Sequence, residues 1–192
     1  AISFQNARRM QKRCLQANAG IYGVCVALEP PLAPTGWRDL AAYEYRTDTG
    51  LAYKDLSGSD HAHTREDWYT LPKHLGRPVW SEPYEWDGVL MVTYSVPIRH
   101  GTPDGPGFIG VVTCDITLDW LEHMIAAIPL GEHGYGVLIS RNGTYVSHPM
   151  TELVLNESIF SVAERLQDPA LRDLGQRMIS EEAGLVKFVS FA

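Results

Sequence analysis

The chain has 192 residues, which is more than one typical domain and few for two, so its length allows one large module or two small ones. Hydrophobic residues make up 45% of the chain and charged residues 20%, which argues against a disordered or low-complexity protein. The 16 basic and 23 acidic residues give a formal net charge of −7, which opposes binding to nucleic acid or to an anionic membrane surface.

The first half of the chain predicts one helix followed by strands. Residues 2–18 carry apolar side chains at steps of three and four, which is typical of an amphipathic helix. Residues 21–28 then read as a buried strand, and residues 41–56 as a hairpin around the turn sequence TDTG. Within residues 65–75 we expect a short helix that ends near Pro72, since proline disrupts helical hydrogen bonding.

Two further strands follow, over residues 88–98 and 108–116. The connection between them is rich in glycine and proline and spans nine residues, RHGTPDGPG, which favours antiparallel neighbours over a crossover pair. The next pattern predicts a helix from Leu118, with Thr117 as its N-cap.

The pattern restarts near residue 130, where we place a module boundary. Asn142-Gly143 is a strong turn signal for a second hairpin, and residues 158–180 then read as helical. The chain begins inside a helical pattern and ends inside an apolar, strand-like run, residues 184–192. We therefore expect that both ends were cut from a longer protein. No apolar run approaches the roughly 18 residues that span a bilayer, and no signal-peptide pattern is present.

Four sequence features in a fixed order carry a family resemblance: REDWY, VWSEPY, VTYSVPI…GFIGVVTCDITLDWL and GYGVLISRNGTYVSHP. Together they resemble the double Cache (PAS-like) extracytoplasmic sensor domain of bacterial transmembrane signalling receptors. The resemblance covers roughly residues 1 to 190.

The resemblance implies an α+β fold with a long N-terminal helix and two PAS-like antiparallel-sheet modules, the second smaller and truncated. The implied parts are an N-terminal signalling helix (1–20), a membrane-distal ligand-binding module (21–130) and a membrane-proximal module (131–192). Such a domain is the periplasmic or extracellular portion of an inner-membrane protein. It is tethered to the membrane and could form a homodimer. The parent receptor would carry a kinase, phosphatase, cyclic-dinucleotide or chemoreceptor output domain.

Amino-acid-binding members of the family have pocket residues that map here onto Trp68 and Tyr69, then Tyr84, then Asp115. The family arginine, which holds the ligand carboxylate in a two-pronged pair, is displaced. Arg65 stands one position too early, and Glu66 occupies the expected place. The resemblance therefore implies the location of the pocket more firmly than a specificity for amino acids.

Strand alternation supports the same location from the residues themselves. It places Met91, Thr93 and Ser95 on one face, and groups Val111, Thr113 and Asp115. These faces could line a cavity roofed by aromatic rings, an arrangement that suits a cationic head group. The expected ligand-binding set is Arg65, Trp68, Tyr69, Trp80, Tyr84, Thr93 and Asp115. Two alternatives stay open: Asp115 could cap the following helix, and the tryptophans could serve packing.

The sequence gives little support for a metal site, a disulfide framework or an enzyme. His61 and His63 lie in a stretch that reads as a solvated loop, so no metal site is expected. The three cysteines form no C-x-x-C pair and no disulfide framework, and Cys114 reads as a buried, inert thiol. No motif of a hydrolase, metalloprotease or phosphate-binding enzyme is present, so we expect neither an enzyme nor a cofactor.

The sequence thus predicts a sensor domain that binds a small molecule, such as an amino acid, an amine or a small organic acid, and relays the signal across the membrane. The alternative is a ligand-free module for protein interaction or dimerisation.

Overall fold

The computed structural model describes residues 3–30, 40–58, 62–102, 105–131, 134–180 and 183–187. The chain divides into two compact units, Ala1–Ser81 with Met91–Thr117 and Glu82–Leu90 with Leu118–Ala192. The division lies in front of Leu118, whereas the sequence pattern suggested a boundary near residue 130.

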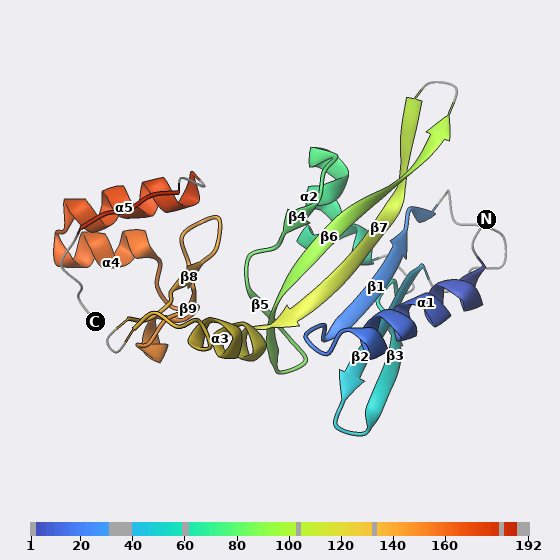
Figure 1. Cartoon of the computed structure of the whole chain (residues 1–192). Helices are drawn as coiled ribbons and strands as arrows, with labels where there is room; N and C mark the ends of the chain where they lie inside the picture. Colours follow the sequence, from blue (N-terminus) through green and yellow to red (C-terminus); the bar gives the residue numbers. More distant parts are fainter. Residues whose placement is uncertain are drawn as a thin grey trace. The chain divides into compact units, whose positions relative to one another are not determined.

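An antiparallel sheet forms the centre of the first unit (Figure 1). The strands run in the order β3-β2-β1-β7-β6-β4, and β5, whose residues are assigned to the second unit, pairs with β6 off this path. Their bounds are β1 Gly23–Leu28, β2 Ala41–Thr47, β3 Gly50–Asp55, β4 Val79–Trp80, β5 Tyr84–Trp86, β6 Val89–Thr102 and β7 Gly105–Thr117. Strand β1 therefore separates β2 from β7, a point that matters for the site.

The predicted antiparallel pairing of the two long strands is confirmed, but the strands are longer than expected. The ladder between β6 and β7 continues to the pair Thr102–Gly105, with a register shift between Ile98 and Arg99. Most of the nine-residue connection is thus strand, because the shift in register lets the ladder continue through its glycines and proline.

Helix α1 (Phe4–Ala17) confirms the predicted N-terminal helix. It begins at Ser3, whose side chain accepts a hydrogen bond from the backbone N–H of Asn6, a standard N-cap. The helix is attached to the sheet by Gln11, whose side-chain amide donates to the carbonyl oxygens of Val24 at 2.9 Å and Ala42 at 2.7 Å. Because Gln11 is buried, these two bonds fix α1 against β1 and β2.

Helix α2 (Asp67–Leu75) follows the short 3-10 helix η2 (Ala62–Arg65). The expected end near Pro72 is wrong, since the helix continues to Leu75 and stops at Gly76, which takes a left-handed conformation with φ 66°. Pro72 lacks an N–H donor, but its carbonyl still accepts from the N–H of Gly76, so the last turn of the helix keeps this hydrogen bond.

The second unit contains helix α3 (Leu118–Ala126) and a small hairpin, β8 (Leu138–Ile139) and β9 (Tyr145–Ser147), as the Asn-Gly turn predicted. The predicted helical region is two helices, α4 (Ile159–Leu166) and α5 (Pro169–Ile179), which are separated where Gln167 takes φ 52°. A 3-10 helix, η3 (Thr151–Leu153), completes the unit. Its core consists of Tyr145, Leu153, Ile159, Val162, Ala163 and Leu171.

The N-terminal helix and the antiparallel sheet confirm the α+β, PAS-like class. A second PAS-like module, and its truncation, stay predictions. Among the described residues, no helix combines the length and the apolar character required to cross a membrane.

Candidate functional site

Three adjacent strands of the first unit place Gly23 (β1), Asp115 (β7) and Thr93 (β6) at one level of the sheet, directly paired across the strands. Directly paired residues point to the same face of a sheet. The structure therefore brings together Thr93 and Asp115, two residues that strand alternation had placed in the candidate pocket.

The carboxylate of Asp115 accepts two short hydrogen bonds, from the hydroxyl of Thr93 at 2.7 Å and from the hydroxyl of Tyr43 at 2.6 Å. Asp115 is only 4% exposed. Burial raises the pKa of its carboxyl group to about 6, and the two hydrogen bonds act in the opposite direction. Because both carboxylate oxygens are held by the sheet, the structure does not support the alternative that Asp115 caps α3.

Tyr43 reaches Asp115 by crossing the strand that lies between them. A Cβ atom added at Gly23 would lie 2.0 Å from the Tyr43 hydroxyl, so the phenol ring passes directly over this glycine. Sequence reasoning missed both residues. Strand alternation predicts which face of the sheet each side chain points to. The role of Tyr43, however, can be inferred only when β2, β1 and β7 are known to be neighbours.

The next level of the same face is also polar. Ser95 (β6) pairs with Thr113 (β7), and Thr113 pairs with Cys25 (β1). Ser95 and Thr113 are at most 2% exposed, and the Ser95 hydroxyl has no hydrogen-bond partner among the described residues. We call Tyr43, Thr93, Ser95, Thr113 and Asp115 the polar row.

A buried hydroxyl without a partner costs about 1–3 kcal/mol. A polar group of a bound molecule would remove this cost at Ser95. Buried polar groups on a sheet face are therefore suited to orient a small ligand.

Tyr69, predicted to contact ligand, is fully buried and serves a second cluster. Its hydroxyl donates to the carboxylate of Glu29 at 2.7 Å, and the ammonium group of Lys73 lies 2.8 Å from the same carboxylate. Burial raises the pKa of Glu29, but the hydrogen bonds from Lys73 and Tyr69 outweigh it and leave the pKa below its ordinary value. Burial and this hydrogen bond raise the pKa of Tyr69. Within the described residues these charges are balanced, so we assign the cluster to the attachment of α2.

Three more of the predicted residues are Arg65, Trp68 and Tyr84. Arg65 is exposed in η2, and Trp68 is half-buried with its ring edge-on to Tyr69 at 6.1 Å. Tyr84 belongs to the second unit, in β5, so the polar row does not include it. Contact of these residues with a ligand stays a prediction.

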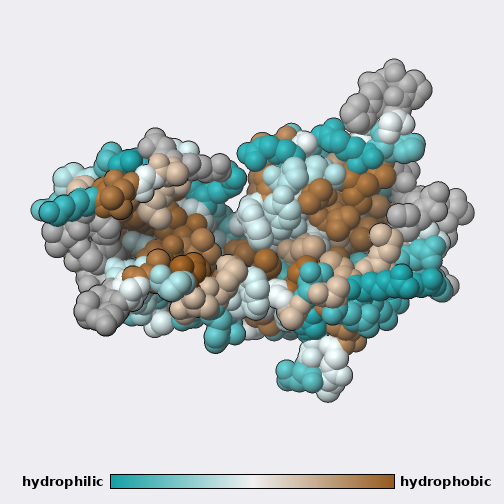
Figure 2. Space-filling model, viewed as in Figure 1, coloured by the Kyte–Doolittle hydropathy of each residue, from teal (hydrophilic) through white to brown (hydrophobic). Residues whose placement is uncertain are grey.

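Trp80 lies on the other face of the sheet from Asp115. It pairs with Tyr94, with ring centroids 4.8 Å apart, whereas Asp115 pairs with Thr93. Neighbouring residues of a strand point to opposite faces. Figure 2 shows apolar surface over β6 and β7. Trp80 therefore cannot roof the polar row in this arrangement, and its ring packs on Tyr94.

The histidine stretch departs from expectation. His63 is fully buried, with Nε2 3.1 Å from the carbonyl oxygen of Leu28, so the prediction of a solvated loop is wrong for this residue. The 3-10 helix turns its ring inward against Tyr69, at 5.2 Å. His61 lies outside the described residues. Within the part of the chain that the structure describes, no group of three metal-binding side chains comes together.

Comparison with known proteins places this geometry in a family. A model of the methyl-accepting chemotaxis protein-like, first PDC sensor domain matches residues 8–123. That range contains most of α1, the whole seven-stranded sheet and the polar row.

Two bacterial chemoreceptors illustrate the similarity in sequence. McpA of Pseudomonas putida is 32% identical over 121 residues, which cover 59% of this chain and 18% of that protein. PctB of Pseudomonas aeruginosa is 32% identical over 133 residues, which cover 67% of this chain and 20% of that protein. The chain thus spans about a fifth of the length of these curated relatives.

Solved structures agree on the fold. The extracellular domain of histidine kinase mmHK1S-Z3 has a TM-score of 0.75 at 20% identity, over 94% of this chain and 67% of that one. The ligand-binding domain of Pseudomonas aeruginosa PctB in complex with L-Gln has a TM-score of 0.58 at 22% identity, over 85% of this chain and 59% of that one.

Proposed function

Because the chain belongs to the family of methyl-accepting chemotaxis protein-like first PDC sensor domains, we propose that it binds a small molecule carrying an ammonium group at Asp115. As a sensor domain, it is a non-enzymatic ligand-binding module. One observation carries the finer proposal: a carboxylate that is 4% exposed is held only by the hydroxyls of Thr93 and Tyr43 among the hydrogen bonds described.

The charge balance of the polar row favours a cation. A carboxylate offers about four acceptor positions, and the two hydroxyls use two of them. A buried carboxylate without an opposite charge is costly, and here burial is the largest effect on the pKa of Asp115. An ammonium group would supply both the missing charge and further donors. The hydroxyl of Ser95 would then bind a second polar group of the ligand.

Ligands named for related domains fit this chemistry. The ligand-binding domains of PctB, PctC and CtaA were solved in complex with L-Gln or L-Arg, GABA and L-valine, respectively. All four molecules carry an ammonium group. For this chain, we propose that the ammonium group is the feature that all ligands share. Because Arg65 lies exposed in η2, we propose that groups outside the polar row bind the carboxylate of the ligand.

We place the domain on the periplasmic or extracellular side of a membrane receptor, which agrees with the extracellular origin of similar structures. In the proposed relay, ligand binding at β6 and β7 changes the position of α1, which is attached to the neighbouring strands through Gln11. A ligand can shift this position only by binding one arrangement more tightly than the other. The distal and proximal roles of the modules, and a homodimer, belong to the same proposal.

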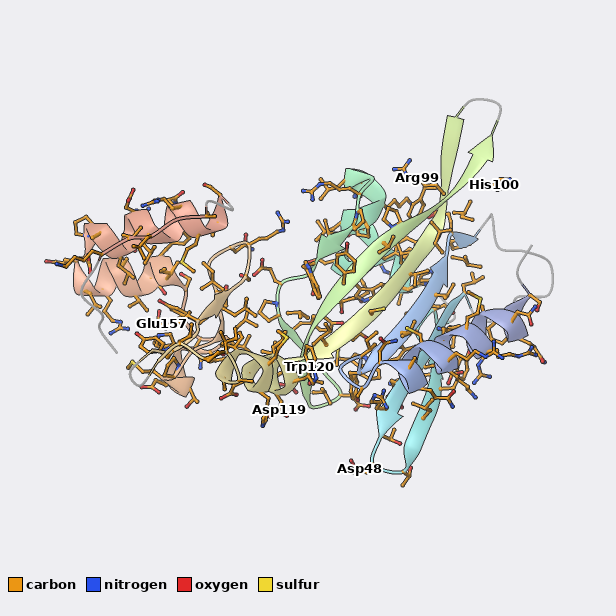
Figure 3. All side chains as sticks on the ribbon, in the orientation of Figure 1. Asp48, Arg99, His100, Asp119, Trp120 and Glu157 are labelled. Atoms are coloured by element: carbon orange, nitrogen blue, oxygen red, sulfur yellow. The ribbon has the colours of Figure 1, made fainter. Side chains whose placement is uncertain are left out.

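Calorimetric titration with three ligand groups tests the proposal: amino acids, amines without a carboxylate, and carboxylates without an amine. We expect binding only from molecules with an ammonium group, and loss of affinity by at least about tenfold in Asp115→Asn, since one charge-assisted pair is lost. Asp48→Asn is the matched control, because Asp48 is exposed at the tip of the β2–β3 hairpin (Figure 3). Wild-type affinity in a folded Asp115→Asn protein would refute the assignment. Absence of binding from the whole panel would favour the ligand-free interaction module instead.

A further inference from the structure

Two cysteines that are distant in sequence meet on the face of the sheet that α1 covers. Cys114 in β7 pairs with Val24 in β1, and the carbonyl of Val24 accepts a hydrogen bond from Gln11 of α1. Cys14 follows Gln11 by three residues, which is about one helical turn, so both side chains lie on one side of the helix. Helix α1 therefore holds Cys14 over β7 at Cys114.

Cys14 lies close enough to Cys114 to raise the pKa of its thiol, although burial has the larger effect. Cys14 and Cys114 are both half-buried, so the expectation that Cys114 is buried is wrong, whereas the expectation of low reactivity agrees with a thiol pKa that burial raises to about 11. The third cysteine differs from this pair in its burial and in the face of the sheet on which it lies. Cys25 is 1% exposed and pairs with Thr113, on the opposite face of the sheet.

We propose that Cys14 and Cys114 form an intramolecular disulfide that ties α1 to β7. The proposal rests on the extracytoplasmic location proposed above, because disulfides form and persist in oxidising compartments. Among the described residues, no group of three metal-binding side chains includes these two cysteines.

The reaction requires an external disulfide, such as oxidised glutathione, as the two-electron oxidant. One cysteine thiolate attacks that disulfide, forms a mixed disulfide and releases the first glutathione thiol. The second cysteine thiolate then attacks the mixed disulfide at the protein sulfur and releases the second. The protein loses two protons and two electrons, and the oxidant becomes two thiols.

The position of the disulfide determines which elements of the first unit it would join. Cys114 directly precedes Asp115, and successive side chains of a strand point to opposite faces. A disulfide at Cys114 would thus attach α1 to the strand that carries Asp115, on the side away from the polar row.

Thiol counting tests the proposal without any ligand, so its outcome is independent of the proposed function. The reduced chain is equilibrated with oxidised glutathione, denatured, treated with N-ethylmaleimide and weighed by mass spectrometry. We expect one adduct on the wild type, at Cys25, and a crosslinked pair of peptides containing Cys14 and Cys114. The same chain kept in reductant should carry three adducts.

Single variants test which two cysteines form the disulfide. Cys25→Ser should keep the crosslink and carry no adduct, whereas Cys14→Ser and Cys114→Ser should each carry two adducts. Three adducts on the oxidised wild type would overturn the proposal. A crosslink between two chains through Cys14, in place of the internal one, would overturn it as well, and peptide mapping of the wild type decides this even if a variant fails to fold.

Discussion

The hydroxyl of Tyr43, in β2, donates a hydrogen bond of 2.6 Å to the carboxylate of Asp115, in β7, although β1 lies between the two strands. The ring can cross β1 because Gly23 has no side chain at the crossing point. The geometry of the carboxylate therefore depends on the absence of a side chain at Gly23.

Gly23→Ala should break this arrangement. The new methyl group would lie 2.0 Å from the Tyr43 hydroxyl and 2.4 Å from the ring carbon that bears it, so the ring must move. Such overpacking typically costs about 1–3 kcal/mol of unfolding free energy. We expect this loss in urea unfolding, together with weaker ligand binding. In Gly101→Ala, where an added Cβ meets nothing within 4 Å, stability should change by less than about 0.5 kcal/mol. Equal stability of the two variants would contradict the close approach.

Asp115 should give the stability of the domain a characteristic dependence on pH. Burial raises the pKa of the carboxyl group from 3.8 to about 6, so the folded state binds the proton more tightly than the unfolded state. The free energy of unfolding should therefore decrease as the pH rises from about 4 to about 6, by about 3 kcal/mol, and then stay level with respect to this group.

Urea unfolding from pH 4 to pH 8 measures this dependence. Asp115→Asn cannot titrate, so its stability relative to the wild type should increase over the same interval. Asp48→Asn should follow the wild-type curve, because this side chain is exposed. Parallel curves for wild type and Asp115→Asn would show that the carboxyl group is not perturbed by folding.

Ligand affinity should depend on the same group in the opposite sense. An ammonium ligand binds the ionised carboxylate, so affinity should decrease as the pH falls below about 6, by about tenfold for each pH unit. Calorimetry in buffers of different ionisation enthalpy should detect proton release near pH 6 and none near pH 8. A pH-independent affinity would indicate that the ligand does not pair with Asp115.

Local patterns were sufficient to predict much of the first unit. The apolar period of residues 2–18 predicted α1, turn residues predicted the β2–β3 hairpin, and alternation grouped Thr93 with Ser95 and Thr113 with Asp115. Each of these features depends on residues that are close in sequence or on the two-residue period of a strand.

Features that depend on strand order could not be predicted in this way. The face of Trp80 follows from the register of the two-residue strand β4, which no sequence pattern specifies. The proximity of Cys14 to Cys114 similarly depends on the position of α1 on the sheet. His63 was misjudged because polar neighbours suggested a loop, whereas a 3-10 helix turns its ring inward.

Arg8 offers a test of how α1 is held, independent of any ligand. The Glu44 side chain is 1% exposed, and its carboxylate lies 2.6 Å from the Arg8 guanidinium and 4.0 Å from the ammonium group of Lys12. The guanidinium also lies over the ring of Tyr53, 3.7 Å from its centroid. Arg8 thus joins α1 to both β2 and β3.

Arg8→Ala should leave the buried carboxylate of Glu44 with only the more distant Lys12, at a cost of about 3 kcal/mol of unfolding free energy. The double variant Arg8→Ala/Glu44→Gln should recover part of the loss, since no buried charge is then unpaired. Arg9→Ala, at an exposed position of the same helix, should change stability by less than about 0.5 kcal/mol. Urea unfolding of the three variants measures these differences. If Arg8→Ala matched Arg9→Ala, the ion pair would contribute nothing to the attachment of α1.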